Sequence, residues 1–480
     1  MPSHPTEFAS AELPPLIQPP KRVFVGPPAE SRATREPRLP GSKYYTLRYL
    51  LDALLADGES LIEAPALSDD TAVLVRTIRA LGGVAQWEQA VDSSAPRWNL
   101  RVTGVNGRPS APPGGALPMG NAGAVLRLTL GIGALLPEAR FETDHPDSLG
   151  RRPNADLLDA LRRLGIQADA REPGGLLPIT LRGGPPRGGA VSVSGLSSSQ
   201  YLSALLYLGP LLPEGLSITI TGGLRSQPLV RATLRALAAA GVTVEAAPDL
   251  LSFQIPGGQR YRARRYETPG DSPSAAALIA AAVALGTPLR LGRLSAPDDD
   301  VRALVGACGT LGLPVSAQTD AAAQSLALTI SAASAGDEAS QSVERAAVRR
   351  IDGDALIDSV PALVALACLL PGETRFENVA TLRLKESDRI DDLCGELTRA
   401  GADATPLPDA IIVRGQPGVL SGGATVHAHD DHRVAQALAI VAMRCARGLT
   451  IEGADAVAKS YPWFFDDLQR LGATVRALDD

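Results

Sequence analysis

The sequence is poor in lysine and cysteine, and it lacks both a long apolar run and an excess of positive charge. Its net charge of −6 argues against nucleic acid as the main partner. The longest apolar runs, such as 275–285, are too short to span a bilayer. At the N-terminus no basic segment precedes an apolar run, as it would in a signal peptide. We therefore expect a cytoplasmic protein that binds neither nucleic acid nor a membrane.

The cysteines are scattered through a long chain and show no CxxC spacing. They are Cys308, Cys368, Cys394 and Cys445. This pattern indicates buried thiols in a reducing compartment, and it excludes a disulfide framework or a zinc site. A chain of 480 residues is expected to form two or more domains, and 45% hydrophobic with 20% charged residues is typical of globular proteins.

Lysine is the rarer cation by far, since only four of the 46 lysines and arginines are lysines: Lys21, Lys43, Lys385 and Lys459. The last three lie in polar motifs. The pKa of an ammonium group can be lowered in a way that a guanidinium does not permit. We therefore treat Lys43, Lys385 and Lys459 as candidate site residues.

A helix-and-glycine pattern recurs six times along the chain. Each copy is an amphipathic helix that ends in a glycine, followed by a β-branched or alternating run; the glycines are Gly82, Gly165, Gly241, Gly312, Gly401 and Gly472. Glycine tolerates the left-handed backbone that follows a helix end. The intervals of 71 to 89 residues predict six copies of one structural unit.

Each copy also contains a second helix that is apolar nearly all round and is therefore predicted to be buried. These helices are predicted at 44–55, 124–136, 201–212, 275–285, 360–370 and 434–445. Polar or glycine-bearing motifs precede them, at 41–43, 120–123, 197–200, 270–274, 354–359 and 430–433. Such motifs are compatible with simple helix caps. If the helix starts converge, however, their amides and the nearby Arg48, Arg127 and Arg433 favour a strongly anionic ligand.

The stretch 383–389, RLKESDR, is the most highly charged part of an otherwise apolar region. A strand is predicted before it at 374–379, and an amphipathic helix is predicted to begin near Ser387. Helical spacing would place Lys385 and Arg389 on one face. The stretch is compatible with a solvated helix start held by ion pairs, or with part of a charged site.

The ordered motifs GSKxxxxR, GNAGxxxR, RRPNADLLDALRRLG, SSQY, GDSPSA, RLKESDR, DDHR and AKSYPWFFDDL resemble the enolpyruvyl transferase superfamily, and within it the 5-enolpyruvylshikimate-3-phosphate (EPSP) synthase family. The resemblance covers residues 38–475. It implies an α/β fold of two similar domains, each with three βαβαββ units around buried parallel helices, like an inverted α/β barrel. The domains would be 41–265 and 1–40 joined to 266–480, with substrates bound between them. From composition, the proline-rich residues 1–20 are expected to be disordered, with a strand near 22–25.

The implied activity is that of a 3-phosphoshikimate 1-carboxyvinyltransferase of the shikimate pathway, which leads to the aromatic amino acids. Such an enzyme transfers the enolpyruvyl group of phosphoenolpyruvate to the 5-hydroxyl of shikimate 3-phosphate and releases phosphate. Two acid/base groups and a cationic cradle suffice for this reaction, so no metal or organic cofactor is expected. The family resemblance also implies a monomer whose partners are these small molecules.

Matched motif by motif, the resemblance implies that Glu386 is the proton shuttle and that Asp358 is the base on the acceptor hydroxyl. It also implies that Lys43 serves the phosphate leaving oxygen. The residues implied to bind phosphoenolpyruvate are Lys43, Asn121, Gly123, Arg127, Arg152, Gln200, Arg389, Arg433 and Lys459. Those implied to bind the acceptor are Tyr44, Arg48, Ser198, Ser199, Ser226, Asp358 and Lys385. Simpler roles stay open for three residues: Asp358 is compatible with a helix cap, His432 with a structural role, and Arg152, before Pro153, with a helix start.

Three positions depart from the family pattern on the acceptor side, and they keep a second hypothesis open. Tyr44 stands where the family has Ser, Leu229 where it has Tyr, and Thr381 where it has Asn. The alternative is a related transferase acting on another cyclic hydroxy acid. A non-catalytic binding paralogue is disfavoured because Lys43, Asp358 and Glu386 are all present. A UDP-N-acetylglucosamine enolpyruvyl transferase is disfavoured because no cysteine precedes Cys308.

Overall fold

A computed structural model describes residues 13–14, 18–28, 37–90, 97–322, 324–331, 348–416 and 418–478. They fold into two compact units. The first unit contains Gly41–Thr268, and the second contains Pro269 onward together with the strand that precedes Gly41. The boundary thus falls three residues after the predicted 265. Most of the segment 1–20, for which disorder is predicted, lies outside the described residues.

The first unit contains three four-stranded sheets. Their orders are β15-β3-β5-β4, β6-β7-β9-β8 and β10-β11-β13-β12, and a short pair, β14-β2, lies beside them. The helices are α1 (Lys43–Leu55), α2 (Asp69–Ala80), α3 (Gly123–Gly133), α4 (Ala155–Arg163), α5 (Ser199–Leu208) and α6 (Gln227–Ala239). The strands are β2 (Ala56–Asp57), β3 (Glu59–Glu63), β4 (Val84–Gln89), β5 (Trp98–Thr103), β6 (Ala116–Pro118), β7 (Glu138–Glu142), β8 (Gln167–Arg171), β9 (Leu176–Arg182), β10 (Gly189–Gly195), β11 (Leu216–Leu224), β12 (Glu245–Ala246), β13 (Ser252–Ile255), β14 (Tyr261–Arg262) and β15 (Arg265–Glu267).

The second unit has the sheets β16-β18-β17, β19-β20-β22-β21 and β23-β24-β1-β25. Its helices are α7 (Ser272–Leu285), α8 (Asp299–Thr310), α10 (Val360–Cys368), α11 (Asp391–Arg399), α12 (His432–Ala442) and α13 (Phe464–Leu471). Its strands are β1 (Arg22–Gly26), β16 (Leu289–Ser295), β17 (Val315–Asp320), β18 (Ser325–Ile330), β19 (Arg349–Asp352), β20 (Gly372–Glu377), β21 (Asp403–Leu407), β22 (Ala410–Gly415), β23 (Thr425–His427), β24 (Leu449–Glu452) and β25 (Thr474–Ala477).

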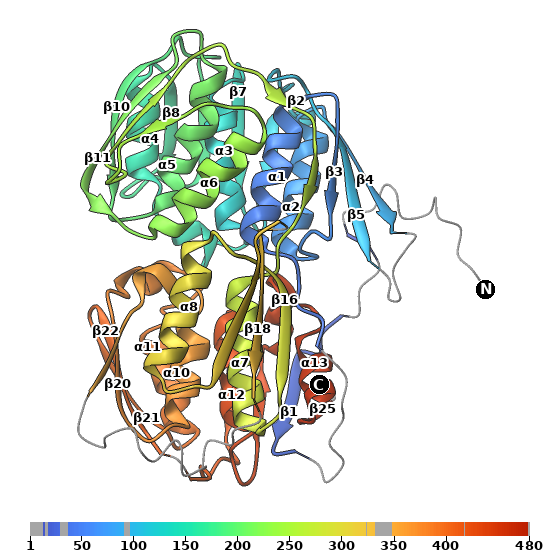
Figure 1. The fold of residues 1–480 in the computed structure, drawn as a ribbon. Coiled ribbons are helices and arrows are strands. Elements are labelled where there is room, and N and C mark those ends of the chain that lie inside the picture. Colours follow the sequence, from blue (N-terminus) through green and yellow to red (C-terminus); the bar gives the residue numbers. More distant parts are fainter. Residues whose placement is uncertain are drawn as a thin grey trace. The chain divides into compact units, whose positions relative to one another are not determined.

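One strand pattern recurs in these sheets, and it confirms the predicted βαβαββ unit. In β6–α3–β7–α4–β8–β9 the first two strands pair in parallel, and the later pairs are antiparallel. The units built on α5, α10 and α12 follow the same pattern. A distant strand completes two of the sheets: β15 pairs with β3, and β1, blue among the red elements of Figure 1, pairs with β24 and β25. The same order of strands and helices along the sequence therefore gives the same strand pairing in each of these units.

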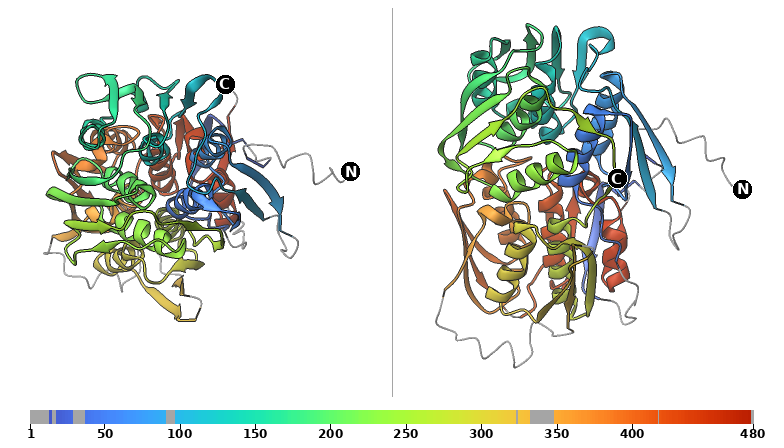
Figure 2. Two further views of the ribbon diagram at one scale, coloured as in Figure 1. Left: turned by 90° about the horizontal axis from the view of Figure 1, so that it is seen from above. Right: turned by 45° about the horizontal axis from the view of Figure 1, so that its top comes forward.

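The apolar helices α1, α3, α5, α7, α10 and α12 are the buried ones, as predicted, and within each unit the sheets surround them (Figures 1 and 2). Every residue of α7 is buried, because its side chains beyond the first turn are alanine, leucine, isoleucine or valine. The amphipathic helices end at the six predicted glycines. All six have positive φ, between 74° and 107°, the region that glycine adopts without steric cost.

All four cysteines are buried and unpaired, as predicted. Burial in apolar surroundings raises the pKa of the Cys308 and Cys394 thiols to about 12 and that of Cys445 to about 11, so these groups are protonated and unreactive. Among the described helices, none is both long and apolar enough to cross a membrane.

Candidate active site

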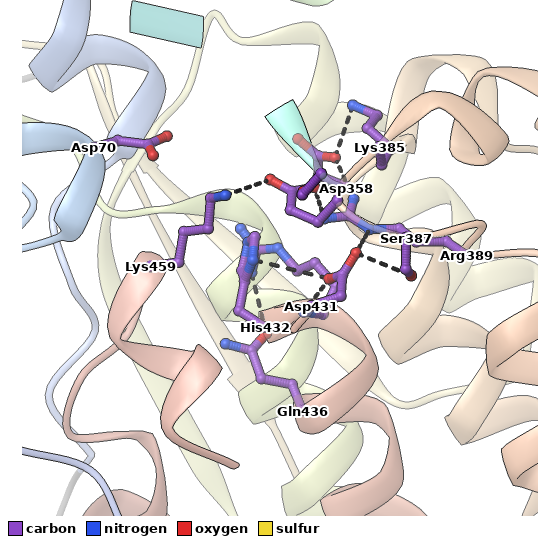
Figure 3. A network of polar contacts seen from close by, with 12 residues as sticks. Asp70, Asp358, Lys385, Ser387, Arg389, Asp431, His432, Gln436 and Lys459 are labelled. Carbon is purple, nitrogen blue, oxygen red and sulfur yellow. Dashed lines mark hydrogen bonds and ion pairs between the residues drawn. The ribbon is translucent and has the colours of Figure 1, made fainter. Parts of the chain in front are cut away.

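Arg389 is the centre of the charged site in the second unit. Its side chain is only 1% exposed, yet three carboxylates surround it (Figure 3). The guanidinium donates from Nη1 to Asp358 at 2.8 Å, from Nη2 to Glu386 at 2.7 Å and from Nε to Asp431 at 2.7 Å. Burial alone would lower the pKa of Arg389, but these carboxylates outweigh burial and raise it. Arg389 therefore carries a permanent positive charge and fixes all three acids.

Two lysines share these acids with Arg389 (Figure 3). Lys385 Nζ lies 3.0 Å from Asp358 Oδ1, and Lys459 Nζ lies 3.4 Å from Glu386 Oε1. Each of the predicted catalytic carboxyl groups of this unit thus has one arginine and one lysine contact. Asp358 is half-buried just before α10, where its carboxylate joins the loop carrying Lys385 to the start of that helix.

Asp431 and Asp271 link the starts of two buried helices in the same network. Asp431 caps α12 by accepting the backbone N–H of Arg433 at 2.8 Å, while its other oxygen binds Arg389. Asp271 caps α7 through Ser274 and lies 3.5 Å from Arg433 Nη2. Arg433 also donates to Gln436 of α12 at 3.1 Å. The helix-cap interpretation and the charged-site interpretation are therefore both correct for these residues.

The prediction of a helix beginning near Ser387 is wrong. Ala380–Leu384 form a 3₁₀ turn, and α11 begins only at Asp391. Lys385 and Arg389 thus lie outside any helix face, and their shared contact with Asp358 brings them together. Arg389 binds Glu386 within the stretch, but it and Lys385 also bind the distant Asp358, and these contacts favour an irregular conformation. The preceding strand is confirmed as β20, two residues earlier than predicted.

In the first unit, Lys43 is the first residue of α1 and pairs with an acid that the sequence analysis did not identify. Its Nζ lies 3.1 Å from Oδ2 of Asp70, and both side chains are buried. Asp70 lies in the first turn of α2, where a carboxylate also stabilises the helix dipole. A first-turn aspartate is common in helices, so the sequence carried no specific signal for this pairing.

Arg127 and Arg152 lie beside the starts of α3 and α5. Arg127 Nη1 donates to the Gln200 side chain at 3.0 Å and so connects these two helices. A Cβ at Gly123 would lie 2.6 Å from Arg152 Nη1, so any residue larger than glycine would force this guanidinium to move. Arg152 follows a 3₁₀ turn and precedes the start of α4 at Ala155 by three residues, so it does not open that helix.

Arg48 joins the starts of α1 and α6 and is 5% exposed. It donates from Nη1 to the Tyr44 carbonyl at 2.9 Å, from Nη2 to the Leu229 carbonyl at 2.8 Å and from Nε to Thr233 at 2.9 Å. Burial lowers the pKa of Arg48 from its ordinary value. Tyr44 and Leu229, two of the positions that depart from the family pattern, thus contact one guanidinium.

The remaining predicted residues of the first unit also lie at helix starts. Ser198 caps α5 by accepting the backbone N–H of Gln200, and Ser199 is the first residue of that helix. Ser226 precedes α6 with a left-handed φ of 52°, an uncommon conformation for serine that is found at binding sites. Asn121 is half-buried just before α3. In the second unit His432 is buried in α12, where its Nδ1 lies 3.8 Å from Asp431.

The structure thus joins the predicted acids and cations of the second unit in one network, whereas those of the first unit form separate contacts at helix starts. It adds Asp70, Asp271, Asp431 and Gln436. Asp271 and Asp431 were within predicted helix entrances, where their capping role hid their contacts with arginine. Among the described residues, no group of three or more histidines, cysteines or acids is arranged to hold a metal ion.

Comparison with known proteins gives consistent matches along the chain. The sequence profile described as EPSP synthase (3-phosphoshikimate 1-carboxyvinyltransferase) matches residues 29–468. A 3-phosphoshikimate 1-carboxyvinyltransferase of Deinococcus radiodurans is 42% identical over 452 residues, which cover 94% of this chain and 96% of that relative. One of Methanosarcina mazei is 32% identical over 92% of this chain and 96% of its own length. A solved EPSP synthase structure from Acinetobacter baumannii has a TM-score of 0.75 at 24% identity, over 95% of this chain and all of that one, so the fold is shared.

Proposed function

The chain belongs to the EPSP synthase family, and we propose that the charged residues of its two units act together on phosphoenolpyruvate and shikimate 3-phosphate. It is accordingly a 3-phosphoshikimate 1-carboxyvinyltransferase of the shikimate pathway. The observation that carries the residue assignments is the pairing of two carboxyl groups, Asp358 and Glu386, around one buried arginine. A reaction that both adds and removes a proton needs two such groups held in different surroundings.

Glu386 is the proposed acid toward C3 of phosphoenolpyruvate. Without ligand it contacts Arg389 and Lys459, which favour its charged form. An incoming phosphoenolpyruvate anion competes for the same two cations. Their ion pairs with Glu386 then weaken, and its carboxyl group takes up a proton more readily. It donates this proton to C3 and later removes one when the tetrahedral intermediate expels phosphate.

Asp358 is the proposed base on the acceptor hydroxyl. Lys385 and Arg389 keep it ionised and oriented while the hydroxyl oxygen bonds to C2. The proton moves from the hydroxyl to the carboxylate, and the new C–O bond forms as the C2=C3 double bond is protonated. In the first unit, Lys43 stabilises the charge of the departing phosphate, with Asp70 holding the ammonium group in place.

The anion cradle of the first unit is proposed to hold both substrates. Arg127, Arg152 and Gln200 bind phosphoenolpyruvate, and Gly123 leaves the space for Arg152. Ser198, Ser199 and Ser226 bind the acceptor phosphate at open helix starts. The carbonyls of Tyr44 and Leu229 both accept from the Arg48 guanidinium, so the two backbone positions lie close together. This proximity supports a compensating exchange between them.

The test is phosphate release from phosphoenolpyruvate, with shikimate 3-phosphate compared against a panel of other cyclic hydroxy acids. We expect turnover with shikimate 3-phosphate at a kcat/KM of about 10⁴ M⁻¹s⁻¹ or above. Turnover with another acid alone would establish the changed acceptor. Binding of phosphoenolpyruvate without any turnover would establish a binding paralogue. The monomeric state and the cytoplasmic location stay predictions.

A further inference from the structure

The turn between β23 and α12 has an unusual backbone. His429 and Asp430 have φ values of 54° and 53°, and the next residue, Asp431, binds Arg389. The left-handed region costs a residue with a side chain roughly 1–2 kcal/mol, and neither position is a glycine. Contacts elsewhere must therefore hold this turn in place.

Glu396 of α11 provides those contacts. Its side chain is 6% exposed, its Oε2 accepts the backbone N–H of His427 at 3.2 Å, and its Oε1 lies 3.0 Å from His429 Nε2. On the other side of the imidazole ring, Nδ1 lies 3.8 Å from Asp392 Oδ1. The imidazole of His429 is thus held between two acids of one helix.

The other charged groups around this cluster are few. His427 pairs with Glu452 of β24 at 3.2 Å, and Arg399 Nε lies 3.9 Å from Glu396 Oε2. Burial raises the pKa of Asp392, and the nearby His429 acts in the lowering direction. Among the described residues, Glu396 contacts the basic side chains of Arg399 and His429, and Asp392 contacts that of His429.

A continuous set of contacts leads from His429 to the active site. Ser387 lies close enough to Asp392 to act on its pKa, in the lowering direction, and its hydroxyl lies 3.5 Å from Asp431 Oδ2, the oxygen that binds Arg389 (Figure 3). His429 is also only two residues before Asp431 in the chain. Any shift of the turn must move the Asp431 carboxylate and the cap of α12, and with them Arg389 and Arg433.

We propose that His429 is a positioning residue for phosphoenolpyruvate binding: its imidazole, held between Glu396 and Asp392, fixes the turn that places Asp431, Arg389 and Arg433. This inference rests on the proposed function of that site. The ring nitrogens have a carboxylate on either side, so the ring ties the turn to α11. Without the ring, the turn is held less firmly, the Asp431 carboxylate is less well placed, and phosphoenolpyruvate binds less tightly.

The test compares kcat and KM of the wild-type enzyme with those of His429→Asn. Asparagine tolerates the left-handed region, so the turn can form without the contacts of the imidazole ring. His427→Gln, in the same cluster, and His145→Gln, an exposed histidine of the first unit, are the matched controls. All variants are first compared by thermal unfolding, and His429→Gln serves as a second variant if His429→Asn does not fold.

We expect the KM for phosphoenolpyruvate to be about threefold higher in His429→Asn than in the wild type, with kcat and the KM for the acceptor changed by less than about twofold. Both controls should keep the wild-type KM. An unchanged KM for phosphoenolpyruvate in His429→Asn, or an equal change in His427→Gln, would overturn the proposal. Direct titration of phosphoenolpyruvate binding repeats the comparison without turnover, so failure of the positioning role is distinguishable from failure of the proposed function.

Discussion

The two units share one repeat but carry different electrostatics at their helix starts. In the second unit, Arg389, Arg433, Lys385 and Lys459 are each paired with an acid. In the first unit, Lys43 has an acid partner in Asp70, while Arg48 and Arg127 donate to carbonyl and amide oxygens. Arg48 and Arg127 thus bind neutral oxygens at these helix starts, whereas the cations of the second unit bind carboxylates.

This difference separates two chemical tasks. Acids held by cations change their protonation when an anion competes for those cations, which suits proton transfer. An arginine bound to neutral oxygens can bind a ligand phosphate or carboxylate without first breaking an ion pair, which suits anion binding. We therefore expect substitution of the paired acids of the second unit to lower kcat most, and changes around the arginines of the first unit to raise KM most.

The largest effect is expected for Glu386→Gln. It removes the titrating group but keeps its size, and kcat should fall by roughly 10²–10⁴-fold with a smaller change in the KM for phosphoenolpyruvate. Steady-state phosphate release measures both constants. Glu377→Gln on β20, whose carboxylate pairs with Arg375 at the surface, is the matched control and should keep its kcat. A near-normal kcat in Glu386→Gln would contradict the proton-shuttle assignment.

A second expectation concerns an acid of the second unit outside the paired network. Burial, together with the nearby charge of Asp298, raises the pKa of Asp300 to about 7. Its folded pKa thus exceeds the unfolded value, so ionisation costs the folded state. The free energy of unfolding therefore falls as the pH rises from about 4 toward 7, by up to about 1.4 kcal/mol per pH unit.

Asp300→Asn should remove this pH dependence, as measured by urea unfolding at pH 4, 5, 6 and 7. Asp299→Asn, the adjacent residue in α8, serves as the control and should keep the wild-type slope. If the free energy of unfolding changed with pH equally in Asp300→Asn and the wild type, ionisation of Asp300 would not cost stability, and Asp300 would resemble the acids paired with arginine or lysine.

A third substitution examines the anion cradle of the first unit. In Gly123→Ala the new Cβ would lie 2.6 Å from Arg152 Nη1, so the guanidinium would have to move. We expect the KM for phosphoenolpyruvate to rise about tenfold, the loss of roughly one charged hydrogen bond, with a smaller change in kcat. Gly306→Ala, on an open face of α8, should leave both constants unchanged. A fall in kcat with an unchanged KM would remove the distinction between the two units.

The smallest effect concerns the repeat that the units share. Gly165→Ala in the first unit and Gly401→Ala in the second should each lower the free energy of unfolding by about 1 kcal/mol, because their φ values are 90° and 94°. Gly395→Ala, inside α11 with open space around it, should raise stability by about 0.5–1 kcal/mol. Similar losses of thermal stability in Gly165→Ala and Gly401→Ala, with a gain in Gly395→Ala, would show that both units end their amphipathic helices with a glycine in the left-handed region. No loss at Gly165 or Gly401 would contradict it.

Most of the helices were predictable from the sequence, because their signals are local. The all-apolar run of α7 and the glycine after each amphipathic helix identify elements within about fifteen residues of chain. The stretch 385–390 was predicted wrongly for the opposite reason. Its side chains bind Asp358 and Asp431, 27 and 42 residues away, and these contacts outweigh the local helical preference.

The sequence by itself determined the six repeats, the buried helices and, through the ordered motifs, the family to which the chain belongs. These features depend on periodicity, on glycine at helix ends and on motifs that can be read one segment at a time. Only the tertiary structure decided which acid meets which cation: Asp70 with Lys43, Asp431 with Arg389, Glu396 with His429. The physical reason is that an ion pair acts over a few ångströms, and packing alone brings residues from distant segments within that range.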